Sequence, residues 1–214
     1  MTLSTGAPVA PASATGSFLE VLDNYYADPE AVRALALSCR FERPFTGQWQ
    51  GLHSLERHPD TRDVFFDIAR RFPVDGQANW DEIESSYKFW GRPSAGMFAL
   101  LLDGQTDTVH FHQRSGAWAA VCYLTLQESC REGIGFYAHK ATGRLGALGS
   151  SPAERELFRA DAPDRTKWTR VKTVDMAFNR MVLFDGRQFH AADDGFGSGP
   201  TDGRMAQLFN MNLG

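Results

Sequence analysis

Two histidines, His110 and His112, stand two residues apart in the short run TVHFH at positions 108–112. Because side chains alternate along a strand, both imidazoles face one side, while Val109 and Phe111 face the other. Two imidazoles on one rigid strand can supply two ligands to a metal ion, and an ordinary hydrogen-bonded pair is the alternative. The pair alone leaves both interpretations open.

A third histidine, His190, follows the strongly apolar run NRMVLFDGRQF with its Asp-Gly turn. Arg204 then opens the last run, RMAQLFNMN. An arginine that faces a protein interior needs an anion, and a bidentate carboxylate is its strongest partner. The alternative is a surface arginine paired with one of three nearby acids, Asp193, Asp194 or Asp202.

Tyr123 lies in the run AWAAVCYLTL, which is apolar on both faces. A tyrosine in such a run needs a partner for its hydroxyl. That partner is either a ligand or, in an ordinary core tyrosine, the backbone.

The order of these residues resembles that of the iron(II)- and 2-oxoglutarate-dependent dioxygenases, particularly the small prolyl-hydroxylase-like members. His190 lies 78 residues after the H-x-H pair, and Arg204 follows 14 residues later. The runs AWAAVCYLTL, GIGFYAH and RMVLFDGRQFH look like family segments at the matching places. The resemblance extends from about residue 83 to the end, and the first hundred residues match no family motif.

The resemblance implies an Fe(II) site, with 2-oxoglutarate and O2 as cosubstrates and a small molecule, an amino acid or a peptide as substrate. It places metal ligands at His110, His112 and His190, and 2-oxoglutarate contacts at Arg204 and Tyr123. The family carries H-x-D where this chain has H-x-H, so the 2-His-1-carboxylate set becomes a three-histidine set. Losing one negative charge weakens the hold on a dication and should raise the reduction potential of the metal.

This departure keeps other functions open. Three-histidine iron sites occur in thiol dioxygenases, which use no 2-oxoglutarate, and a jelly-roll module that binds metal or ligand without catalysis is a further alternative. Halogenating family members have a small residue in place of the aspartate. Halogenation ranks lower here because His112 is bulky.

The elements that must position these residues are mostly short strands. From about residue 83, β-branched and aromatic runs alternate with turn clusters such as GRPSAG, DGQTD and SGPTDG. Helical patterns appear at 28–39, 59–72 and 151–161, two of them beginning with Asp-Pro or Ser-Pro. The pattern predicts an α+β, mainly β protein, with a double-stranded β-helix (jelly roll, cupin-like) core and flanking helices.

Composition indicates an ordinary globular protein. The 214 residues carry a formal net charge of -4 without a basic stripe, which argues against a nucleic-acid partner, and no apolar run is long enough to cross a membrane. We expect a disordered tail at 1–16 and a single jelly-roll oxygenase-like domain at 17–214. Three cysteines without C-x-x-C spacing favour reduced thiols and a cytoplasmic location.

Overall fold

The protein is described from a computed structural model, which covers residues 18–43, 50–73, 79–81, 84, 95–112 and 117–212. The predicted tail at 1–16 lies outside these residues, as does nearly all of the run IESSYKFW at 83–90, where the strand-rich part was expected to begin. Within the described residues, no helix is both long enough and apolar enough to cross a membrane.

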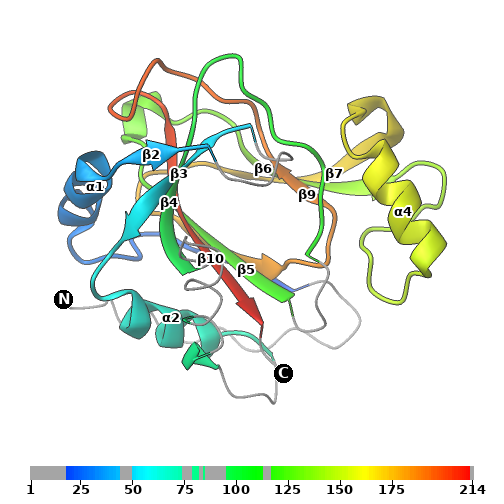
Figure 1. Ribbon diagram of the computed structural model, residues 1–214, viewed down its shortest axis with the longest axis horizontal. Helices are drawn as coiled ribbons and strands as arrows, with labels where there is room; N and C mark the ends of the chain where they lie inside the picture. The colour runs from blue at the N-terminus through cyan, green and yellow to red at the C-terminus, as the bar shows by residue number, and fades with distance from the viewer. Residues whose placement is uncertain are drawn as a thin grey trace.

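The described strands form two antiparallel sheets (Figure 1). The larger sheet has, in spatial order, β1 (Leu19–Leu22), β8 (Met181–Asp185), β5 (Ala117–Tyr123), β10 (Arg204–Asn212), β4 (Ala95–Leu101), β3 (Leu52–Arg57) and β2 (Phe41–Glu42). The smaller sheet has β7 (Trp168–Asp175), β6 (Gly133–His139) and β9 (His190–Ala192). The expectation of a mainly β protein is confirmed, and the double-stranded β-helix remains a prediction.

All three predicted helices form, and two of them begin where their caps indicate. The carboxylate of Asp28 accepts from the N–H of Ala31 at the start of α1 (Pro29–Ser38). Ser151 and Glu154 form a reciprocal capping box at the start of α4 (Pro152–Asp161). Helix α2 (Thr61–Ala69) follows β3, and two short 3-10 helices, η1 (Gln127–Ser129) and η2 (Arg165–Lys167), lie in connections. Figure 1 shows α4 beside β7, on the opposite side of the molecule from α1.

Side chains alternate between the two faces of the larger sheet, and strands such as β4 and β8 are buried on both because each face packs against other elements. One face packs against α1 and α2, in a cluster that includes Val32, Phe65, Phe98, Cys122, Met205 and Phe209. The other face packs toward the smaller sheet, through Ala119, Tyr123, Ile134, Phe136, Val182 and Phe184. A third cluster joins α4 to the smaller sheet, through Phe158, Trp168 and Phe189. His190 begins β9 of the smaller sheet, and His110 forms an isolated bridge to it.

The predicted strand at 108–112 is wrong as a regular strand. His110 makes one isolated bridge, to His190, whereas the N–H of the neighbouring Val109 bonds to the carbonyl of Ala162 after α4. A continuous ladder cannot form when successive backbone groups bond to different elements. The alternation of side chains nevertheless holds, because Val109 and Phe111 pack on the cluster around α4.

Candidate metal centre

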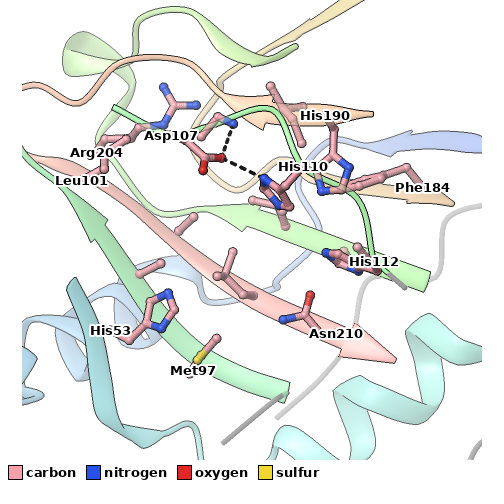
Figure 2. Close-up of a pocket in the computed structure, with 18 of the residues that line it drawn as sticks. His53, Met97, Leu101, Asp107, His110, His112, Phe184, His190, Arg204 and Asn210 are labelled. Carbon is pink, nitrogen blue, oxygen red and sulfur yellow. Dashed lines mark hydrogen bonds and ion pairs between the residues drawn. The ribbon is translucent and has the colours of Figure 1, made fainter. Parts of the chain in front are cut away.

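The three histidines come from two distant segments and lie together. His110 and His190 face each other in an antiparallel bridge, with N–H to O distances of 2.9 and 3.0 Å. The backbone N–H of His112 donates to the carbonyl of Gly186 at 2.8 Å, in the turn between β8 and β9. One potential ligand atom of each imidazole lies within 4.8 Å of the other two, and Figure 2 shows the three rings gathered on one side of a cavity.

Hydrogen bonds fix the protonated nitrogen on two of these rings. Nδ1 of His110 lies 2.9 Å from the carbonyl oxygen of Thr108, and Nδ1 of His190 lies 2.8 Å from that of Gln188. A carbonyl oxygen only accepts, so each Nδ1 carries the hydrogen and each Nε2 keeps its lone pair. Metal-binding histidines commonly have this arrangement, with the outer nitrogen bonded to a carbonyl or carboxylate.

Burial favours the neutral form of His190 and His112. It lowers the pKa of His190 well below the ordinary value, and the neighbouring His110 and His112 act in the same direction. Burial, with His110, lowers the pKa of His112 to about 3. Neutral imidazoles are the form that binds metal, and a nitrogen donor set suits Fe, Ni, Cu and Zn.

The histidines border a cavity of about 300 Å³ between the two sheets. Its floor is made of alternate residues on three adjacent strands of the larger sheet. These are Met97, Ala99 and Leu101 on β4, Ala119, Val121 and Tyr123 on β5, and Arg204, Ala206, Leu208 and Asn210 on β10. The two-residue period therefore places Arg204 and Tyr123 in the same cavity as the histidines.

Arg204 and Tyr123 each present an unsatisfied polar atom. Their side chains are 4% and 2% exposed, and the guanidinium carbon lies 5.8 Å from the centre of the tyrosine ring. Nη2 of Arg204 donates to the carbonyl of Gly133, while Nη1 and the Tyr123 hydroxyl have no hydrogen-bond partner among the described residues. Burial raises the pKa of Tyr123 to about 12, against the opposing effect of Arg204, so the hydroxyl stays protonated. Both atoms are donors that a buried anion could satisfy.

The surface interpretation of Arg204 is wrong, because the side chain is buried. Asp193 instead forms an ion pair with Arg170, and the carboxylate of Asp202 accepts from the N–H groups of Ser198 and Gly199.

The sequence did not single out Asp107, a buried carboxylate in the cavity wall that is 4% exposed. Its Oδ2 accepts from the N–H of Ala192 at 2.9 Å and lies 3.6 Å from Nδ1 of His110, as the dashed lines in Figure 2 show. Burial raises the pKa of Asp107, while His110, the bond from Ala192 and the charge of Arg165 oppose that shift. Its position three residues before His110 is the only sequence signal, and a weak one.

Known structures with a similar fold include HygX and SnoK. HygX from Streptomyces hygroscopicus, with nickel, 2-oxoglutarate and hygromycin B bound, superposes with a TM-score of 0.57 at 10% identity, covering 92% of this chain and 83% of HygX. SnoK, a non-haem alpha-ketoglutarate-dependent carbocyclase from nogalamycin biosynthesis, gives 0.52 at 15% identity, with 91% and 79% covered. The chain therefore shares the fold of 2-oxoglutarate-dependent enzymes.

No curated protein sequence matches the chain. A family model does match it, over residues 7–207. Since the match covers nearly the whole chain, this protein belongs to the family of unknown function DUF6445.

Proposed function

We propose that this protein is a non-haem Fe(II) enzyme that uses 2-oxoglutarate and O2 to oxidise a small molecule, an amino acid or a peptide. One observation carries the proposal. Two unsatisfied donors, Nη1 of Arg204 and the hydroxyl of Tyr123, are buried in the cavity that the three histidines border. An unpaired buried donor is costly, so a cavity that holds two of them is suited to an anionic ligand.

The metal part of the proposal assigns His110, His112 and His190 as ligands. Three neutral nitrogens within 4.8 Å of one another fit a transition-metal dication. The carbonyls of Thr108 and Gln188 hold two of the rings, so these ligands are oriented before a metal arrives. Bound iron with 2-oxoglutarate supplies an O2-dependent two-electron oxidation of a substrate C–H bond, while 2-oxoglutarate loses CO2 and becomes succinate.

The cosubstrate part assigns Arg204 and Tyr123 to the far carboxylate of 2-oxoglutarate. Nη1 and the hydroxyl would each donate to a carboxylate oxygen, and the guanidinium would supply the matching charge. Nη2 is held by the carbonyl of Gly133, which limits the freedom of the guanidinium. The rest of the cavity floor is mostly apolar and would exclude water from the reacting groups.

Finer features belong to the same proposal. The two sheets would form the double-stranded β-helix of prolyl-hydroxylase-like enzymes, within a single domain at 17–214. HygX binds hygromycin B, and a small-molecule substrate of that general kind is compatible with the cavity. All three cysteines are free, which is compatible with a reducing cytoplasmic location.

The test is an anaerobic titration. The protein is loaded with Fe(II), and 2-oxoglutarate is added while the visible spectrum is followed for the weak charge-transfer band of chelation. We expect the band in the wild-type protein. Arg204→Ala should raise the dissociation constant for 2-oxoglutarate about 10- to 150-fold, since hydrogen bonds to charged groups contribute about 1.5–3 kcal/mol.

Arg33→Ala is the matched control. Arg33 is also buried and also donates to backbone carbonyls, those of Leu124 and Thr201, but it does not line the cavity. It should leave the titration unchanged. If iron binds but no charge-transfer band appears, the cosubstrate assignment is refuted. O2 consumption without succinate would then indicate a three-histidine oxygenase that uses no keto acid. Metal binding without O2 consumption would indicate a non-catalytic binding module.

A further inference from the structure

Asp107 joins the two segments that carry the histidines. Its Oδ2 accepts from the N–H of Ala192 on β9, two residues after His190, and lies 3.6 Å from Nδ1 of His110. Its backbone carbonyl accepts from Nη2 of Arg165 at 2.6 Å, and the same nitrogen lies 3.3 Å from the carbonyl oxygen of Ala192. The bond from Ala192 therefore holds the carboxylate beside the His110 ring, and Arg165 holds the backbone of Asp107.

The charge of Asp107 matters because the ligands carry none. Three neutral imidazoles would leave a bound dication uncompensated in a cavity with low polarity, where charge interactions are strong. Among the described residues that line the cavity, Asp107 is the sole acid, and the sole guanidinium, Arg204, adds a positive charge. A carboxylate next to the outer nitrogen of a ligating histidine also raises the basicity of that ligand.

From this arrangement, and resting on the proposed metal site, we propose that Asp107 is a positioning residue. It orients His110 against β9 and supplies, from outside the ligand set, the negative charge that three histidines lack. A purely structural role, in which Asp107 only caps the N–H of Ala192, is the competing explanation.

Two substitutions separate these roles. Asp107→Asn keeps the shape and an acceptor for the Ala192 N–H but removes the charge. Asp107→Glu keeps the charge but has to fit an extra methylene into a buried place. A structural role predicts that Asn is tolerated better than Glu, whereas a charge role predicts the reverse.

The experiment measures Ni(II) and Fe(II) dissociation constants anaerobically, by competition with a chelator, together with the Fe(III)/Fe(II) potential and the melting temperature of the metal-free protein. We expect Asp107→Asn to weaken metal binding about 10- to 100-fold, the usual range for partners of ligands, and to raise the potential. Asp107→Glu should retain more affinity than Asp107→Asn, with a potential closer to that of the wild type.

The matched control is Asp161→Asn. The carboxylate of Asp161 lies 3.0 Å from Nε2 of the buried His139. The two residues form a histidine-carboxylate pair that does not line the cavity. Asp161→Asn should leave metal affinity and potential unchanged. The charge role is overturned if Asp107→Asn has the metal affinity and the potential of the wild type, or if it binds metal more tightly than Asp107→Glu. The proposed metal site stands in either case. A wild-type protein that binds neither metal overturns the proposed site and this inference together.

Discussion

Gly186→Ala tests whether His112 is a ligand without touching any histidine. A Cβ at position 186 would lie 2.5 Å from Nδ1 of His112 and 2.9 Å from its Cγ. Ordinary van der Waals contact begins at 3.4 Å, so the ring has to move by about 0.9 Å. The segment cannot simply retreat, because the His112 N–H donates to the carbonyl of Gly186 itself at 2.8 Å.

This displacement is large on the scale of metal coordination. Ligand distances in a metal site hold to within about 0.2 Å, so a shift several times that size removes or strains the bond. We expect the affinity for Ni(II) to fall about 10- to 100-fold, which corresponds to about 1.4–2.8 kcal/mol. The fold should persist, since the clash is with one side chain at the cavity edge.

Isothermal titration with Ni(II) measures the effect, and Gly199→Ala is the matched control. A Cβ at position 199 meets nothing within 4 Å, so its metal affinity should equal that of the wild type. Wild-type affinity in Gly186→Ala would refute the reasoning and leave His110 and His190 as the ligands. A coordination position not filled by His112 could then hold a halide, so halogenation would again be an alternative.

Further predictions concern the cosubstrate site, the fold and pH. Tyr123→Phe should raise the dissociation constant for 2-oxoglutarate about 3- to 10-fold without lowering the melting temperature of the metal-free protein, since its hydroxyl has no partner among the described residues. His139→Phe breaks the bond to Asp161 and should lower the free energy of unfolding by about 1–3 kcal/mol in urea, with metal affinity unchanged. In the folded protein, His112 and His190 have pKa values below the ordinary value of about 6.5, so the unfolded chain takes up protons first. The free energy of unfolding of the metal-free protein should therefore fall as pH drops from about 6.5 toward 3, and a flat series of urea midpoints over that range would contradict this.

The sequence was informative wherever a local pattern sets the structure. The runs AWAAVCYLTL and RMAQLFNMN contain β5 and β10, and the pairing of Tyr123 with Ala206 brings Arg204 and Tyr123 onto one face of the larger sheet. Helix starts followed from Asp-Pro and Ser-Pro because capping depends on residues next to one another. Strand alternation and helix capping depend on residues close together in the chain, so a single sequence is enough to predict them.

Local patterns could not predict the hydrogen bonds between segments that lie far apart in the chain. The bond of Asp107 to Ala192 spans 85 residues. In the run DGQTDTVHFH only the closer spacing to His110 distinguishes the buried Asp107 from the exposed Asp103, and that spacing does not predict burial. The segment around His110 failed as a regular strand for the same reason: its backbone partners lie after α4 and on β9, and only the assembled fold brings them near.

The charges of the cavity bear on whether a histidine at position 112 is compatible with 2-oxoglutarate. Arg204 and Asp107 are the charged side chains among the described lining residues, and their formal charges cancel. Fe(II) and the 2-oxoglutarate dianion also cancel, so the filled three-histidine cavity is neutral, whereas an aspartate at position 112 would leave one net negative charge. When Fe(II) is bound without 2-oxoglutarate, the two positive charges of the metal and the one of Arg204 are opposed only by the carboxylate of Asp107 among the described lining residues. Each of the two partners should therefore bind more tightly when the other is present, by the same factor in both directions. If Fe(II) instead binds tightly and its affinity does not change when 2-oxoglutarate is added, His112 would indicate a site that uses no keto acid.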